Sequence, residues 1–224
     1  MTRFFDILLS LAAMIILLPF MLPVMLILKC TGEHYIFYSQ KRIGRKGKEF
    51  NLLKFATMLK DSPNLGTGDI TLKNDSRVLP FGKFLRKSKI NELPQLINIF
   101  IGDMSVVGPR PLTPRNFKGY SQEDQAVIIK MRPGLTGVGS IVFRSEEKLL
   151  EQVTGDSFEF YKNKILPYKA QLEHWYYQKQ SFVLYVMIIV ITAVSLFLPG
   201  NRLAWKVFKD LPALPDELGR LYEG

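Results

Sequence analysis

Residues 7–28 read ILLSLAAMIILLPFMLPVMLIL, which is a run of 22 residues without a charge. As an α-helix this run would extend about 33 Å, enough to cross the ~30 Å hydrocarbon core of a bilayer. A signal peptide is a poorer interpretation, because Asp6 offsets Arg3 before the run and no small-residue cleavage site follows it. The sequence therefore predicts a membrane-associated helix here.

Two prolines, Pro19 and Pro23, interrupt the second half of this run. A proline inside a helix removes a backbone hydrogen bond and clashes with the preceding turn, so it kinks or breaks the helix. Basic residues flank both ends of the run, Arg3 before it and Lys29 after it. From this pattern two paths stay open: a kinked transmembrane anchor, and a re-entrant hairpin that enters and leaves by the same face.

A second uncharged run covers residues 182–198. As a helix it would extend roughly 26 Å, which is marginal for crossing a bilayer. The aromatic and basic cluster at residues 175–179 suits a headgroup layer, and a crossing would put the basic tail on the far side. Shallow insertion, a re-entrant path and a buried core helix all stay open.

Composition narrows the kinds of site that the chain can build. Of 224 residues, 47% are hydrophobic, and 30 Lys and Arg against 20 Asp and Glu give a net charge of +10. This excludes a disordered chain and indicates an anionic partner: nucleic acid, a membrane surface or a phosphorylated substrate. With one cysteine, Cys30, and only His34 and His174, a disulfide or a cysteine zinc site is excluded. Any metal would need carboxylates, hence a hard cation such as Mg²⁺.

Between the two apolar runs, from about residue 31 to 165, the sequence is typical of a globular domain. Residues 35–39 and 50–55 are β-like, and the basic, glycine-containing turn 44–48 between them predicts a hairpin. Residues 108–111 and 134–139 are rich in glycine and proline and are expected to form loops.

Two helices are expected in the same region. Residues 81–87 look helical, and Leu93, Leu96, Ile97 and Phe100 fall at i, i+3, i+4 and i+7, which predicts an amphipathic helix over residues 92–100. Asn91 would be its N-cap, and Pro94 would lie in its first turn, where a missing N–H costs little.

Basic residues cluster near Asn91 and Glu92, where a helix N-terminus would itself attract anions. Arg110 stands between two prolines, which restrict its backbone and favour a fixed guanidinium clamp for phosphate. Glu92 could hold a Mg²⁺ that bridges diphosphate oxygens, and Asp69 and Asp103 are other candidate carboxylates. The alternative for most of these cations is a solvated or headgroup-facing surface, and for Asn91 a plain helix cap.

Seven motifs then occur in an order that resembles the bacterial sugar transferase family, the monotopic phosphoglycosyl transferases. They are Lys54-Phe55-Ala56-Thr57-Met58, Asp75-Ser76-Arg77-Val78, Gly82-Lys83-Phe84-Leu85-Arg86-Lys87, Asn91-Glu92-Leu93-Pro94-Gln95-Leu96, Gly102-Asp103-Met104-Ser105, Val107-Gly108-Pro109-Arg110-Pro111 and Arg132-Pro133-Gly134-Leu135-Thr136-Gly137. The resemblance covers about residues 1 to 195.

The resemblance implies an α/β, mostly helical, monotopic membrane protein at the cytoplasmic face of the bacterial inner membrane. The expected parts are a re-entrant membrane hairpin (1–30), a cytoplasmic catalytic-type domain (31–165), an interfacial or inserted helix (166–200) and an amphipathic tail (201–224). The expected bend of the hairpin lies near Pro19 or Pro23. A small hairpin or sheet and interfacial amphipathic helices complete the fold.

The resemblance also implies a reaction. Members of the family transfer a sugar-1-phosphate from a UDP-sugar to undecaprenyl phosphate, which starts assembly of a capsule, O-antigen or glycoprotein glycan. An Asp attacks the sugar-bearing phosphate, UMP leaves, and the lipid phosphate attacks the phospho-enzyme, while the adjacent Glu holds Mg²⁺. Partners would be these substrates, membrane lipids, and a second copy or a glycan-pathway protein. A nucleic-acid binder has no motif to support it.

Carried onto this chain, the catalytic positions are Asn91 and Glu92, with Glu92 as the Mg²⁺ ligand. The basic side chains assigned to phosphate or nucleotide are Lys54, Arg77, Arg86, Arg110, Arg132 and Arg144.

The chain departs from the family pattern where the chemistry occurs. Asn91 replaces the dyad Asp, Ala56 replaces an Arg, and Tyr185 replaces an Asp, which together indicate a natural subfamily. An amide is not a usable nucleophile. Three accounts remain: direct attack by lipid phosphate, a replacement carboxylate such as Glu92 or Asp103, and an inactive member that binds nucleotide sugar or polyprenol phosphate as a partner or regulator in glycan assembly.

Overall fold

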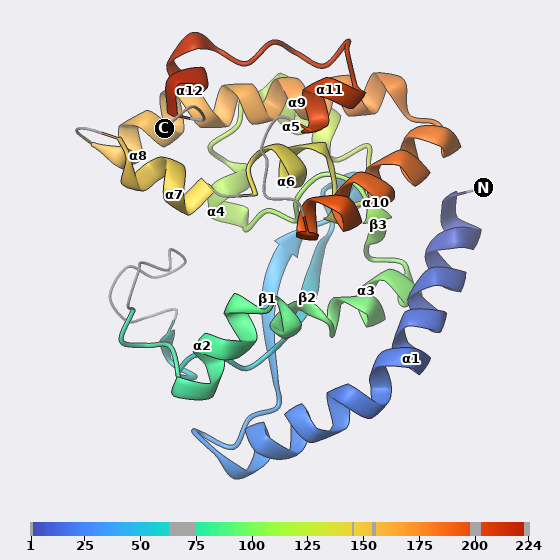
Figure 1. Ribbon diagram of the computed structural model, residues 1–224, viewed down its shortest axis with the longest axis vertical. Helices are drawn as coiled ribbons and strands as arrows, with labels where there is room; N and C mark the ends of the chain where they lie inside the picture. Colours follow the sequence, from blue (N-terminus) through green and yellow to red (C-terminus); the bar gives the residue numbers. More distant parts are fainter. Residues whose placement is uncertain (1, 63–74, 145, 154–155, 198–202, 222–224) are drawn as a thin grey trace. The chain divides into compact units, whose positions relative to one another are not determined.

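The computed structural model describes residues 2–62, 75–144, 146–153, 156–197 and 203–221. These residues are mostly helical, with two small sheets of two strands each (Figure 1). The chain divides into two compact units: unit 1 is Met1–Phe4, Lys41–Phe50 and Asp103–Gly224, and unit 2 is Phe5–Gln40 and Asn51–Gly102. The expected mostly helical architecture with a small sheet is confirmed, and the four-part division stays a prediction.

Helix α1 (Thr2–Cys30) is continuous and contains both Pro19 and Pro23. Figure 1 shows that α1 changes direction along its length, as expected for a helix that loses backbone hydrogen bonds at prolines. Within the described ranges it is the helix with the length and hydropathy to cross a membrane. The prolines are thus tolerated in a bent helix, and the re-entrant path stays a prediction.

The burial of α1 is inverted relative to a helix of a soluble protein. Asp6 and Ser10 are at most 1% exposed, whereas Ile16 is 66% and Phe20 69% exposed. Soluble proteins seldom leave a long contiguous row of large apolar side chains in water. The pattern therefore favours an apolar surrounding for most of α1 and supports membrane association.

One stripe of α1 packs within unit 2. Leu17, Met21, Val24 and Leu28 recur at helical spacing and lie in one apolar cluster. The cluster also takes in side chains of strand β2 (Glu49–Phe55), helix α2 (Pro80–Lys87) and the 3₁₀ turn η3 (Ile90–Glu92), namely Phe55, Phe81, Leu85, Ile90 and the following Leu93. This apolar seam therefore supports the turn that carries Asn91 and Glu92.

The predicted hairpin is confirmed with altered bounds. Strand β1 (Phe37–Ile43) pairs with β2 across the short 3₁₀ turn η1 (Arg45–Gly47), and the Lys48 carbonyl accepts from the Gly44 N–H over 2.8 Å. The first strand starts two residues later than predicted and continues to Ile43, because strand pairing uses backbone groups and is not ended by a charged side chain such as Arg42.

The prediction of a helix over residues 92–100 capped by Asn91 is wrong at its start. Helix α3 is Gln95–Ile101 with Pro94 at its N-cap, and Asn91 lies inside η3. Lys89 has a left-handed backbone (φ 60°), which starts the tight turn. Pro94 has no N–H to donate to an earlier carbonyl, so regular helical bonding begins only after it. The other helix, predicted over 81–87, is confirmed as α2.

In unit 1, strands β3 (Ser105–Val107) and β4 (Gly134–Thr136) form a parallel pair. Ser105 lies opposite Gly134, and Val107 lies opposite Thr136. A loop over 134–139 was expected, and instead β4 leads directly into helix α6 (Val138–Val142). The pair needs glycine, because a Cβ at Gly134 would lie 2.1 Å from the Gly108 nitrogen.

The remaining helices of unit 1 cover this pair. Helix α9 (Leu166–Lys179) packs against α5 (Gln122–Ile128) and α6, and α10 (Phe182–Phe197) packs against α6, β3 and β4. Shorter elements are α4 (Pro114–Phe117), α7 (Glu146–Glu151), α8 (Ser157–Phe160), the π-helical turn η4 (Tyr161–Ile165), α11 (Leu203–Val207) and α12 (Asp216–Leu221).

The second apolar run forms helix α10. Leu184, Tyr185 and Ile188 are buried, whereas Val183 and Val190 on another face are more than half exposed. One face is thus core, and residue 198, the last of the uncharged run, lies outside the described part. Contact of the exposed face with lipid stays a prediction.

Gly82 in α2 offers a test of the packing of unit 2. A Cβ there would lie 2.2 Å from the Thr57 carbonyl oxygen, a backbone atom that cannot rotate away. We expect Gly82→Ala to lower the free energy of unfolding by about 1–3 kcal/mol, although alanine is the better helix former. Thermal unfolding in detergent measures the loss. Exposed Lys83→Ala in the same helix is the control, and equal midpoints for the two variants would contradict the close approach.

Candidate functional site

The turn η3 places Asn91 and Glu92 differently although they are neighbours. Hydrogen bonds from the Glu92 N–H to the Lys89 carbonyl (3.0 Å) and from the Leu93 N–H to the Ile90 carbonyl (3.1 Å) fix the turn. Asn91 is 6% exposed, and its Oδ1 is buried without a hydrogen-bond partner among the described residues. A buried amide oxygen of this kind is costly unless something else donates to it.

Glu92 faces a lysine of the hairpin. The Lys54 Nζ lies 3.9 Å from Glu92 Oε1, and the two side chains are 22% and 28% exposed. The structure therefore brings three of the predicted site residues, Lys54, Asn91 and Glu92, into one part of unit 2. An amine and a carboxylate, both reachable from solvent, stand beside a buried amide.

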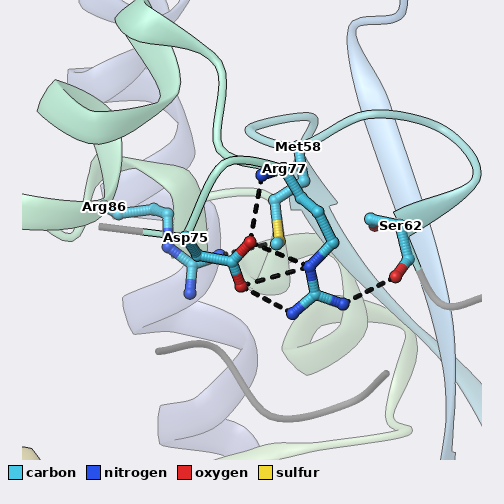
Figure 2. A network of polar contacts seen from close by, with 5 residues as sticks. All are labelled: Met58, Ser62, Asp75, Arg77 and Arg86. Carbon is cyan, nitrogen blue, oxygen red and sulfur yellow. Dashed lines mark hydrogen bonds and ion pairs between the residues drawn. The ribbon is translucent and has the colours of Figure 1, made fainter. Parts of the chain in front are cut away.

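Arg77, which the sequence assigns to phosphate, is buried in an internal network (Figure 2). Its Nε and Nη2 donate to the Asp75 carboxylate over 2.6–3.1 Å, and its Nη1 donates to the Ser62 carbonyl over 2.7 Å. The two side chains of the ion pair are only 6% and 7% exposed. Phosphate binding by Arg77 stays a prediction, and here its guanidinium holds Ser62 and Asp75 together.

Arg86, the third predicted basic residue of unit 2, is half-buried on α2. Its Nη1 lies 3.4 Å from the Met58 sulfur (Figure 2). A thioether is a weak acceptor. Its role toward phosphate stays a prediction.

Arg110 belongs to unit 1 and lies on an immobilised loop. Its neighbour Pro109 accepts a hydrogen bond from the Gly134 N–H (2.7 Å), and Pro111 accepts from Arg42 Nη1 (3.0 Å). The Arg110 side chain is exposed and borders a small, mostly apolar hollow that includes Phe117 and Met131. A rigid backbone with an exposed guanidinium fits the expected clamp.

The other two predicted arginines also lie in unit 1. Arg132 is half-buried just before β4, and Arg144 is exposed and donates to the Ser195 carbonyl of α10. Among the alternative carboxylates, Asp103 is half-buried before β3, and Asp69 lies outside the described residues.

Unit 1 contains a buried ionic cluster that the sequence interpretation missed. The Lys169 Nζ lies 2.5 Å from Glu146 Oε1 and about 5 Å above the rings of Phe143 (5.1 Å) and Tyr161 (5.0 Å). Burial lowers the pKa of Lys169, and Glu146 opposes this. One turn later Glu173 is 6% exposed, and burial raises its pKa to about 8 despite the nearby Lys169.

Two further residues escaped the sequence interpretation for identifiable reasons. Asn98 bonds to the backbone of β2, but in the sequence it is one polar position within an apolar helix pattern. Asp75 was noticed only as part of a motif, and its pairing with Arg77 two residues later had no separate signal. The i, i+4 spacing of Lys169 and Glu173 is visible in the sequence and indicates that the two side chains lie on one face of a helix.

The donor set near η3 is compatible with Mg²⁺. No group of three or more His, Cys, Asp or Glu side chains gathers as a metal site in the described ranges. Mg²⁺ nevertheless needs only one or two carboxylates when waters and substrate phosphates complete its shell. Glu92, partly exposed and beside a single amine, fits such a ligand.

Comparison with known proteins places the sequence among sugar transferases. A family model described as bacterial sugar transferase matches residues 1–199. The exopolysaccharide production protein ExoY of Rhizobium meliloti is 35% identical over 171 residues, which cover 69% of this chain and 74% of the relative.

Other relatives carry more specific names. A UDP-glucose:undecaprenyl-phosphate glucose-1-phosphate transferase of Xanthomonas campestris is 32% identical over 202 residues, 89% of this chain and 39% of the relative. An undecaprenyl-phosphate galactose phosphotransferase of Salmonella typhimurium is 34% identical over 170 residues, 70% of this chain and 35% of the relative.

The Arg77–Asp75 pair predicts a non-additive effect on stability. Arg77→Gln leaves a buried carboxylate without its cation, so we expect a clear drop in the thermal midpoint, whereas Arg77→Gln with Asp75→Asn should recover part of it. Lys83→Gln, on an exposed lysine of α2, is the control. If the thermal midpoint of the double variant falls by as much as those of Arg77→Gln and Asp75→Asn together, the two residues do not stabilise the protein as a pair.

Glu173 predicts a pH dependence of stability. Its pKa is about 8 when folded, against 4.5 as the ordinary value. The folded state therefore holds a proton that the unfolded state has released, so this residue's contribution to stability is complete below about 4.5 and is lost as the pH rises to about 8. Glu173→Gln should raise the midpoint by a few degrees at pH 8 and much less at pH 5.

Thermal scans from pH 5 to 8 measure this effect, with the exposed Glu123→Gln as control. A constant difference between Glu173→Gln and the native protein across the range would exclude the titration.

Proposed function

Since the chain belongs to the bacterial sugar transferase family, we propose that it transfers a sugar-1-phosphate from a UDP-sugar to undecaprenyl phosphate in the synthesis of a lipid-linked glycan. Family members with these named activities supply the substrate class. The observation that carries the proposal is the Lys54–Glu92 pair beside buried Asn91. The family resemblance assigns Asn91 and Glu92 to catalysis and Lys54 to phosphate or nucleotide binding.

The proposed route is a direct displacement. An oxygen of the lipid phosphate attacks the sugar-bearing phosphorus of the UDP-sugar, a new P–O bond forms, and the bond to the bridging oxygen breaks so that UMP leaves with that oxygen. This route needs no protein nucleophile, which suits an amide at position 91. Catalysis is then positioning and charge stabilisation.

Each residue has a task in this route. The Lys54 ammonium attracts the diphosphate, and the unpartnered Asn91 Oδ1 accepts a hydrogen bond from a donor of the bound ligand. Glu92 would hold Mg²⁺, which when bound neutralises charge on the phosphate oxygens. Arg110 in unit 1 stays a separate candidate for phosphate binding on its fixed loop.

The membrane supplies the second substrate. The inverted burial of α1 supports its insertion, and its bend supports the re-entrant path that the family resemblance implies. Basic residues in the last turn of α1 (Lys29) and after it (Lys41 and Arg42) favour the cytoplasmic face of the bacterial inner membrane.

Asn91 also favours a second function, that of a catalytically inactive member that binds a UDP-sugar or polyprenol phosphate and acts through a partner. Lys54 and Glu92 would then provide affinity without turnover. The two functions differ in whether UMP is formed.

Turnover of the protein in nanodiscs with Mg²⁺, undecaprenyl phosphate and each of several UDP-sugars decides between them. We expect UMP release with one sugar, only when lipid phosphate is present, and no phosphorylated protein by mass spectrometry. Glu92→Gln should lower the rate by about 10²-fold, because it removes the charge that holds the metal.

Asn91→Asp and Asp103→Asn complete the experiment. Asn91→Asp should allow UMP release without lipid, since it supplies a carboxylate nucleophile. If Asp103→Asn or Glu92→Gln loses turnover, and mass spectrometry of the native protein finds that same carboxylate phosphorylated, a covalent route replaces the direct one. If the native protein binds UDP-sugar but only Asn91→Asp releases UMP, the binding function is correct.

A further inference from the structure

Asn98 is a buried amide that bonds to the backbone of a neighbouring strand. Its side chain, on α3, is 1% exposed. The Leu53 N–H donates to Asn98 Oδ1 over 2.9 Å, and Asn98 Nδ2 donates to the Asn51 carbonyl over 2.8 Å. Residues two apart in a strand direct these groups to the same edge, so one amide satisfies both. Asn98 thus makes the two hydrogen bonds that a neighbouring strand would otherwise make with β2 at this point.

This amide clip lies next to the candidate site. Lys54 directly follows Leu53, and its Nζ lies 3.9 Å from Glu92, which stands on the turn just before α3. The η3–α3 segment and β2 are therefore joined twice, once by the clip and once by the ion pair.

The two connections differ in strength. A partly exposed ion pair between flexible side chains contributes little and does not hold a strand in register. The clip is buried and bidentate, and breaking it would leave a backbone donor and a backbone acceptor without this hydrogen-bond partner. The clip therefore sets the geometry, and the ion pair follows from it.

We infer that Asn98 is a positioning residue: by fixing the register of β2 against η3 and α3, it keeps the Lys54 amine beside the Glu92 carboxylate. This geometry belongs to the protein without ligand, and its consequence for ligand binding rests on the function proposed above.

The first measurement needs no ligand. Lysine acylation by an amine-reactive ester is followed by mass spectrometry in detergent. Lys54 should react several-fold faster in Asn98→Ala than in the native protein, and about as fast as in Glu92→Gln. Buried Lys169 of unit 1 is the internal reference and should not change. Leu96→Val, which shortens another buried side chain of α3, should lower the thermal midpoint without changing Lys54.

The second measurement uses UDP with Mg²⁺ and calorimetry. Asn98→Ala and Lys54→Met should each weaken binding by about tenfold, and the double variant should bind no worse than Lys54→Met alone. A residue with a merely structural role would instead add its effect to that of Lys54→Met.

Asn98→Gln guards against a variant that does not fold, because it keeps a neutral amide at this position. Its longer side chain displaces both hydrogen bonds without removing the donor and the acceptor, so its Lys54 reactivity should lie between the native protein and Asn98→Ala. Unchanged Lys54 acylation in both Asn98 variants overturns the inference. If the native protein fails to bind UDP, the proposed function loses support, while the acylation result still decides the role of Asn98.

Discussion

A charge buried in protein must meet a partner, and this constraint decides which cations of the chain are available to a ligand. Arg77 is buried and its guanidinium is taken up by Asp75 and Ser62. Lys169 is mostly buried and is held by Glu146. Lys54, on β2 and paired with Glu92, and Arg110, on its proline-flanked loop, keep more of their side chains exposed. Burial thus separates the cations that hold the protein together from those that solvent can reach.

The same constraint gives Asn91 a physical meaning. A carboxylate at this buried position would add a negative charge next to Glu92, whereas the amide adds none and leaves the Lys54–Glu92 pair as it is. An Asp in place of Asn91 would therefore change the charge at this turn as well as offer a nucleophile.

The sequence predicted the features that depend on local pattern: the long apolar helix, the basic hairpin and α2. It missed the start of α3, because the left-handed Lys89 and the tight turn are set by packing of Ile90 and Leu93. It placed Lys54, Asn91 and Glu92 through motif order. It did not find Asn98, Glu146 or Lys169, because a buried polar partner becomes recognisable only when distant segments are brought together.

The apolar seam along Leu17, Met21, Val24 and Leu28 makes α1 part of the core of unit 2. A helix packed in this way is not a separable appendage: removing it would expose Phe55, Leu85, Ile90 and Leu93 and take away the support of the turn that holds Asn91 and Glu92.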